Sequence, residues 1–320
     1  MATALITLTG TALGESDGRV QPRLTRNWQA PTVEDVDGFI AALPSPNDGD
    51  GDDEPTATNV KSAIASLTKV LNSNADKRTR FKLQHRLAAL YLTAALDSHR
   101  SELAEYKSAL AEHYARGNSG KEPAVDHNRS QAFLSKSLDT YRNLLSAAPA
   151  YNARGDVALN IGRILARLGS PNALPDLTKV AVDFPKSPFA DRAKLLIAEL
   201  QLKSAKTSEA GQSTLGTLGK SKDRTVRAYA NYLAAWMEIK LTPTTSGDDN
   251  GFAGSDSTSS AITTMRELAA RECRGTPSAA AQILCQQISD DLVFRFGNSQ
   301  QVNATEIYFK SRRYLTRYIL

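Results

Sequence analysis

The chain lacks several features that would place it quickly in a class of protein. No stretch approaches the roughly 20 apolar residues that a membrane-spanning helix needs. Aromatic residues make up only 7% of its 320 residues, and the long alternations of Val, Ile and Thr that a β-sheet needs are missing. The apolar residues are mainly Ala and Leu, which favour helices. The composition therefore predicts a mostly α-helical protein, and its 41% hydrophobic content favours an elongated array over one compact globule.

Motifs of common catalytic sites are missing as well. The sequence has no nucleophile elbow, no Gly-rich phosphate loop after a strand, no HExxH motif and no convincing Ser, His and Asp set. These absences predict a protein that is not an enzyme and needs no cofactor. The alternative is a helical accessory region of a peptidoglycan-processing enzyme whose catalytic domain lies outside this chain.

The sequence offers two weak patterns for metal binding. The run Asp48–Glu54 resembles the start of a calcium loop, but Asp53 stands where glycine is required and Asn59 where a bidentate glutamate should be. Four histidines follow one another at a spacing of fourteen residues: His85, His99, His113 and His127. Fourteen residues of helix span roughly 21 Å, so neighbours on one helix cannot share an ion. We therefore predict no metal site.

Only two cysteines are present, Cys273 and Cys285. They fall at the end of one predicted helix and inside the next. In an oxidising compartment they would form a disulfide across a helical hairpin, and in the cytosol they would be two buried thiols. No CxxC motif indicates redox chemistry. We predict the disulfide.

Charge divides the chain at about residue 58. Residues 1–58 hold three Arg, no Lys and ten Asp or Glu, a net charge of −7, whereas the remainder holds 36 basic and 24 acidic residues, a net charge of +12. The acidic segment is rich in Pro, Gly and Asp and is predicted to be extended, with a short docking helix at Val33–Leu43. Residues 1–16 are typical either of a disordered start or of a trimmed export signal.

Helix signals dominate residues 59–320. Val60, Ile64, Leu67 and Leu71 form one apolar stripe at helical spacing. Similar patterns predict further helices at about 81–96, 102–114, 130–147, 153–168, 173–182, 189–203, 208–218, 225–241, 259–273, 278–296 and 304–320. Short breaks between most of them predict antiparallel hairpins stacked into a solenoid. Loop insertions are expected near 116–130 and 242–260.

Part of this region follows the spacing of a tetratricopeptide repeat, in which small residues, an aromatic residue and a closing proline recur. In "SLDTYRNLLSAAP" the matching residues are Ser137, Tyr141, Leu144 and Pro149. In the next unit they are Ile161, Gly162, Gly169 at the turn, Phe184 and Pro185, and in the unit after it Ile197, Ala198, Glu209 and Ala210. At the boundary, Pro185 should end one helix while Ser187 and Pro188 cap and begin the next.

Units that end in Phe-Pro-x-Ser-Pro-x-Ala resemble the tetratricopeptide-like repeats of bacterial envelope proteins. The resemblance covers about residues 130–240. It implies a right-handed solenoid of five or six helical hairpins over residues 59–320. It also implies a non-enzymatic scaffold that binds other proteins in the periplasm or at the outer membrane; a cytoplasmic location is the alternative. The C-terminal "EIYFKSRRYLTRYIL", which interleaves aromatic and basic residues, leaves a nucleic-acid adaptor as a competing function.

In a helical solenoid the first helix of each hairpin lines the concave groove, so the exposed sides of helices 153–168, 189–203 and 225–241 are the predicted partner surface. The polar residues off their apolar stripes are Asn160, Arg163, Arg167, Lys194, Glu199, Lys203, Arg227, Asn231 and Glu238. The arginines and lysines among them would suit an acidic partner segment, or the chain's own Asp48–Glu54 run.

Overall fold

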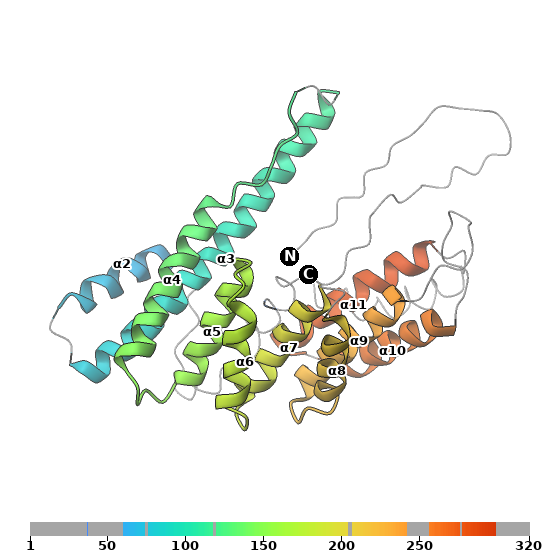
Figure 1. The fold of residues 1–320 in the computed structure, drawn as a ribbon. Coiled ribbons are helices and arrows are strands. Elements are labelled where there is room, and N and C mark those ends of the chain that lie inside the picture. The colour runs from blue at the N-terminus through green and yellow to red at the C-terminus, as the bar shows by residue number, and fades with distance from the viewer. Residues whose placement is uncertain are drawn as a thin grey trace. The chain divides into compact units, whose positions relative to one another are not determined.

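Helices form all the regular structure in the part of the chain that the computed structural model describes: residue 37 and residues 60–73, 76–117, 120–203, 207–241, 256–275 and 277–298. No strand occurs among these residues, so the predicted all-α class is confirmed for them. The helices are shown in Figure 1: α2 (Val60–Leu71), α3 (Lys77–Ala115), α4 (Asn128–Ala147), α5 (Arg154–Arg167), α6 (Ala173–Asp183), α7 (Pro188–Leu202), α8 (Ser208–Leu218), α9 (Arg224–Leu241), α10 (Asp256–Glu272) and α11 (Ala279–Asn298).

Two compact units contain these helices, and the division falls within α9, after Ala234. In the larger unit each helix from α2 to α8 contacts the next one along the chain, and α5 also contacts α7. In the other unit α10 contacts α11.

The first long helix differs from the sequence prediction. Separate helices were expected at 81–96 and 102–114, but α3 runs without a break for 39 residues. The stretch between the two predicted helices contains neither glycine nor proline, and Arg100 pairs with Asp97 one turn away at 2.9 Å. Glu102 is then buried against the start of α4, which lies beside α3 (Figure 1). Packing against α4 therefore keeps α3 helical across residues 97–101, where the apolar pattern is weak.

The end of α6 and the start of α7 lie close to their predicted positions. α6 ends at Asp183, and α7 begins at Pro188 after Ser187, whose side chain accepts a hydrogen bond from the N–H of Phe189 at 3.1 Å. Proline at the first helical position has no N–H that would need a partner, so Ser187 and Pro188 together favour the start of a helix. Gly169, predicted at the turn between α5 and α6, has φ 64°, which favours glycine.

The predicted packing positions fit the structure in two units and miss in the third. Ser137, Tyr141 and Leu144 are buried on α4. Gly162 of α5 is packed so closely that a Cβ would lie 2.5 Å from Leu177 Cδ2 of α6. In the third unit Glu209 and Ala210 are exposed, and the buried small residues are Ala198 of α7 and Gly211 of α8. The second half of that repeat is therefore shifted by one residue from the predicted register.

Several predictions fall wholly or partly outside the described residues. The acidic segment, including the Val33–Leu43 docking helix, is described only at Asp37. The predicted helix at 304–320 is not described at all. Within the predicted insertion at 242–260, α10 already begins at Asp256, so the loop prediction is wrong for its last five residues.

Candidate functional site

The polar face of α5 is the first candidate site. Asn160, Arg163 and Arg167 are three and four residues apart, which places them one above another on the same side of the helix. The rest of α5 is mainly apolar and packs against α4, α6 and α7. Because the neighbouring helices fix α5, its polar stripe is held on a rigid element.

Two arginines of this stripe hold the carboxylate of an aspartate from the N-terminal segment. Arg163 Nε lies 2.5 Å from Asp37 Oδ1, and Arg167 Nε lies 2.5 Å from Asp37 Oδ2. Arg163 Nη2 also donates to the backbone carbonyl of Asp37 at 3.5 Å. Asp37 is 0% exposed and Arg163 is 7% exposed, so solvent has little access to their ion pair. We call Asp37, Arg163 and Arg167 the arginine clasp.

The charges of the arginine clasp keep Asp37 ionised. Burial raises the pKa of Asp37, but the charges of Arg163 and Arg167 and their hydrogen bonds lower it more, so the pKa lies below its usual value. Burial lowers the pKa of Arg163, whereas Asp37 raises it by charge and by hydrogen bonding, and the net direction is upward. Both groups are therefore charged at neutral pH.

A series of polar contacts links Arg163 of the arginine clasp to Asn160, Asp156, His85 and Tyr151. Arg163 Nη1 donates to Asn160 Oδ1 at 2.7 Å, and Asn160 Nδ2 donates to Asp156 Oδ1 at 3.3 Å. The other oxygen of Asp156 lies 2.9 Å from His85 Nε2 of α3, whose Nδ1 lies 3.0 Å from the Tyr151 hydroxyl. Asp156 also acts on Arg163 as a second negative charge. Arg163 is therefore subject to two carboxylates, those of Asp37 and Asp156.

The predicted exposed surface is partly wrong. Asn160, Arg163 and Glu199 are buried, because Asp37 and the neighbouring helices cover them, and they do not lie on an open face. Their contact with a separate partner protein stays a prediction. Of the nine predicted residues, Asn160, Arg163 and Arg167 share one hydrogen-bonded site with Asp37.

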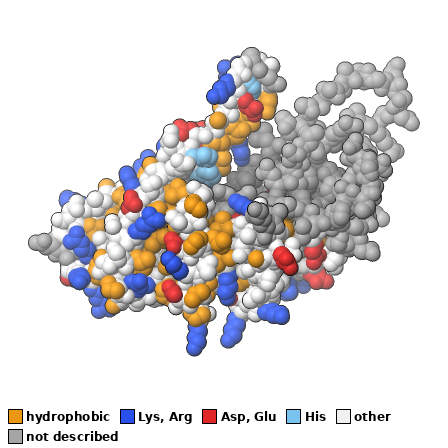
Figure 2. All heavy atoms as spheres, viewed as in Figure 1, with side chains coloured by type: hydrophobic (Ala, Val, Ile, Leu, Met, Phe, Trp, Pro, Cys, Tyr) orange, Lys and Arg blue, Asp and Glu red, His pale blue; other side chains and the backbone are white. Residues whose placement is uncertain are grey.

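The other predicted residues have local roles. Lys194 lies 3.2 Å from Asp191 within α7, and Lys203, which directly follows α7, lies 3.5 Å from Glu199. Arg227 donates to the carbonyl of Ser221. Two more, Asn231, which is half-buried, and Glu238, which is exposed, lie on α9. Figure 2 shows Lys and Arg side chains spread over the face in view, with no single basic patch among the described side chains.

Sequence reasoning missed Asp37. It located an acidic ligand in the Asp48–Glu54 run, which lies outside the described residues, and it predicted a docking helix at Val33–Leu43 without assigning a role to Asp37. The available signal was an aspartate within a short apolar run, followed by Phe39 and Ile40. That signal is common, and nothing local links it to arginines 126 and 130 residues away.

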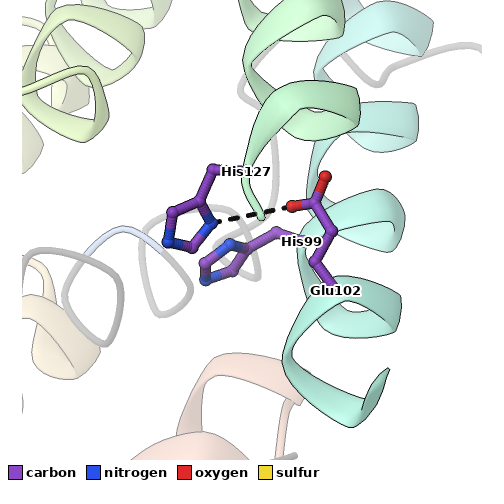
Figure 3. A group of neighbouring side chains, drawn as sticks. All are labelled: His99, Glu102 and His127. Carbon is purple, nitrogen blue, oxygen red and sulfur yellow. Dashed lines mark ion pairs between the residues drawn. The ribbon is translucent and has the colours of Figure 1, made fainter. Parts of the chain in front are cut away.

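A second cluster joins α3 to the start of α4. His99 and Glu102 lie three residues apart on α3, and His127 directly precedes α4 (Figure 3). Glu102 is 2% exposed; its Oε1 accepts from the N–H of Ser130 at 2.9 Å and its Oε2 from the Ser130 hydroxyl at 2.6 Å. Burial raises the pKa of Glu102, but these hydrogen bonds and nearby charge lower it more, so its net direction is downward.

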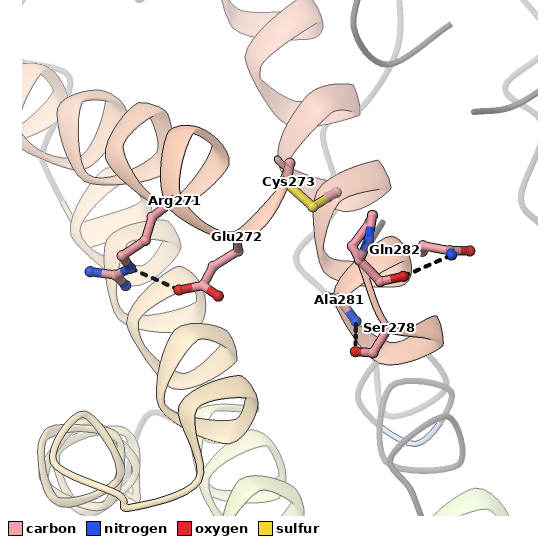
Figure 4. The surroundings of a disulfide bond; sticks show 8 residues. Arg271, Glu272, Cys273, Ser278, Ala281 and Gln282 are labelled. Atoms are coloured by element: carbon pink, nitrogen blue, oxygen red, sulfur yellow. Dashed lines mark hydrogen bonds and ion pairs between the residues drawn. A yellow bond between two sulfur atoms is a disulfide. The ribbon is translucent and has the colours of Figure 1, made fainter. Parts of the chain in front are cut away.

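The two cysteines lie together in the unit of α10 and α11, as predicted. Cys273 and Cys285 form a disulfide with their Cα atoms 5.7 Å apart, between the end of α10 and the first turns of α11 (Figure 4). Near it, the Ser278 hydroxyl accepts from the N–H of Ala281 at 3.3 Å and so caps α11. The disulfide therefore links the end of α10 to α11 across the turn between them.

Comparisons with known proteins leave the chain without a family. No protein-family model, no curated protein and no solved structure matches it. Among the described helices none has the length and apolar character that crossing a membrane requires.

Proposed function

We propose that the protein is a non-enzymatic scaffold that binds other proteins, and that the arginine clasp is its receptor for an aspartate-bearing segment. The observation that carries this proposal is the docking of Asp37 on α5. Two guanidinium groups on α5 receive one carboxylate from a segment more than 120 residues away in sequence. Arginine is suited to this task because its planar group binds carboxylates with fixed geometry.

We further propose that the larger unit is a right-handed solenoid of antiparallel, tetratricopeptide-like hairpins. The close approach of Gly162 to Leu177 supports it, because such repeats need a small residue where two helices of one hairpin cross. The contact of α5 with α7 supports it as well, since stacked hairpins bring alternate helices together. Solenoids of this kind present a continuous surface to extended partner segments.

The proposed location is an oxidising compartment, the bacterial periplasm or the outer-membrane surface, where the protein would belong to a multiprotein envelope assembly. The disulfide between Cys273 and Cys285 supports this location, because disulfides persist in such compartments and are rare in the cytosol. On the face seen in Figure 2 the described basic side chains are scattered, and this face does not present the clustered positive charge that nucleic acid selects for.

A peptide experiment tests the receptor directly. The full-length Asp37→Ala variant removes the internal carboxylate and opens the clasp. A fluorescent peptide with the sequence of residues 33–43 should bind this variant, and it should bind the wild-type chain at least about tenfold more weakly, because the attached segment competes at an effective concentration of order millimolar.

Two controls assign the binding to the clasp. The same peptide with asparagine in place of Asp37 should not bind, and adding Arg163→Gln and Arg167→Gln to the Asp37→Ala variant should abolish binding. Equal binding of the aspartate and asparagine peptides would show that the apolar residues carry the docking. The scaffold proposal would then lose its receptor site.

A further inference from the structure

We propose that His99, Glu102 and His127 form a binding site for Zn²⁺ that fastens α3 to the start of α4. This proposal does not rest on the proposed protein-binding function, although Arg167 of the arginine clasp lines the same hollow as His99 and His127. It rests on three donor groups from two elements, on the way Glu102 is held, and on the hollow beside the histidines.

The donors are already gathered. One nitrogen of each histidine and one carboxylate oxygen of Glu102 all lie within 4.8 Å of one another. In a tetrahedral zinc site with bonds of about 2.0–2.1 Å, donor atoms are about 3.3 Å apart. The donors would therefore have to move closer together, by side-chain rotation, when they bind the ion. The two imidazole rings are also nearly parallel, with centroids 5.2 Å apart and planes inclined by 26°.

Glu102 is fixed as a metal-binding carboxylate needs to be. Ser130 donates to both of its oxygens, one through the backbone N–H and one through the hydroxyl. Such outer contacts orient metal ligands in known sites. The hydrogen bonds also cap α4, which has no cap from the His127 side chain. Capping explains the position of Glu102, but it gives no reason for two imidazole rings to meet at the same carboxylate.

The charge around Glu102 favours a cation. Two ring or guanidinium nitrogens lie near its carboxylate, His127 Nδ1 at 3.7 Å and Arg129 Nε at 3.9 Å, and both lie beyond hydrogen-bonding distance. The guanidinium of Arg129 instead binds Glu105, at 2.6 Å. A buried carboxylate is stable only when it is well paired, and a divalent ion between Glu102 and the two histidines would pair it closely.

A hollow of ≈ 110 Å³ adjoins the cluster. It is lined by His99 and His127 together with Ser130, Gln131 and Arg167, whose guanidinium group is held by Asp37. This space leaves room for a water molecule as the fourth ligand of the ion, the arrangement of three protein ligands and one open position. Two imidazoles and one carboxylate suit Zn²⁺ and related transition metals, whereas Ca²⁺ and Mg²⁺ prefer sets made of oxygen alone.

The fourteen-residue spacing of the histidines did not predict this site. The fourteen-residue spacing excludes an ion shared by consecutive histidines on one helix, but His99 and His127 are two intervals apart and come from different elements. The segment from 116 to 127 returns the chain to α3 and brings His127 beside His99. A bound ion would therefore close this segment as a loop and fix the α3–α4 pair.

The test uses the full-length protein, freed of metal by a chelator and titrated with Zn²⁺ against a chromophoric competitor. We expect one Zn²⁺ per chain with micromolar or tighter affinity and a higher Tm with zinc than without. His99→Ala, His127→Ala and Glu102→Gln should each weaken binding by more than about 100-fold, and Ser130→Ala by about tenfold. His113→Ala, on the same helix but outside the cluster, should bind like the wild type.

Folding is checked in the metal-free state, where each variant should keep its helical circular dichroism; His99→Gln and His127→Gln replace any alanine variant that unfolds. The wild-type chain gives a test without substitution: Zn²⁺ should protect His99 and His127, but not His113, from acylation by diethyl pyrocarbonate. Failure of the wild type to bind stoichiometric Zn²⁺ would overturn the proposal. Unchanged zinc affinity in the His99→Ala and His127→Ala double variant would also overturn it.

Discussion

The arginine clasp makes a strong prediction for the single substitution Asp37→Asn. Asparagine has the shape of aspartate but no charge, and only one of its two terminal groups accepts hydrogen bonds. One of the two guanidinium groups of Arg163 and Arg167 therefore loses its partner while it stays buried, and both keep their mutual repulsion.

The structure sets the size of the effect. Asp37 is 0% exposed and the side chains of both arginines are 9% exposed, so solvent screens the ion pairs little. Removing one partner of a buried ion pair costs about 3–5 kcal/mol of unfolding free energy. In a unit of roughly 200 residues, each 1 kcal/mol shifts Tm by about 2–4 °C. We therefore expect Tm to fall by about 6–20 °C.

Urea unfolding followed by circular dichroism measures the free energy, and Asp97→Asn is the matched control. Asp97 pairs with Arg100 at 2.9 Å on the surface of α3, so the same substitution there should cost no more than about 0.5 kcal/mol. A double-mutant cycle of Asp37→Asn with Arg163→Met should give a coupling of at least about 1 kcal/mol. A loss below about 1 kcal/mol without coupling would refute the docking of Asp37 on α5.

The same pair predicts a pH dependence. The pKa of Asp37 is lowered in the folded state, below an unfolded value of about 3.9. Its contribution to stability is therefore complete above the unfolded pKa and is lost as the pH falls through the folded pKa. The difference in unfolding free energy between wild type and Asp37→Asn should be constant from pH 7 to about 5 and should shrink below about 4. A difference that stays constant down to pH 2 would contradict the buried ion pair.

Two further predictions concern the helical framework. Reducing the bond between Cys273 and Cys285 should lower the stability of the α10–α11 turn by about 3 kcal/mol, detectable as a lower melting transition with reductant than without. Gly162→Ala should cost about 1–3 kcal/mol because its Cβ would lie 2.5 Å from buried Leu177 Cδ2, whereas Gly216→Ala on α8, with no atom within 4 Å, should stabilise by up to about 1 kcal/mol in urea unfolding.

Local patterns predicted most of the helices because their signals lie within a few residues. The start of α7 depends on the Ser187 side chain, which accepts from the N–H of Phe189, and on Pro188. The turn after α5 depends on the positive φ angle of Gly169. Tyr141 and Leu144 were recognisable as core positions by their spacing on α4. The continuity of α3 was not predictable in this way, because the contact that carries it through Glu102 comes from Ser130 on another helix.

The candidate site was predictable in part. Asn160, Arg163 and Arg167 were selected as polar residues off the apolar stripe of a helix, and the structure brings them together. Their burial was not predictable, because it depends on Asp37, which is distant in sequence and carries no special local pattern. Periodicity reports which side of a helix is apolar, but it does not report what covers the other side.

The contacts of Asn160 and Asp156 indicate that Arg163 of the arginine clasp is oriented before a carboxylate binds. Arg163 is held by Asn160, and Asn160 by Asp156, so the guanidinium is oriented without help from Asp37. Preorganised groups bind more tightly because less freedom is lost on binding. In the Asp37→Ala chain, adding Asp156→Ala should therefore weaken binding of the 33–43 peptide by about tenfold, the equivalent of about 1.4 kcal/mol. Asp176→Ala, on the partly exposed face of α6, should leave peptide binding unchanged. Equal affinity in the Asp156 variant would mean that the peptide itself orders the arginines.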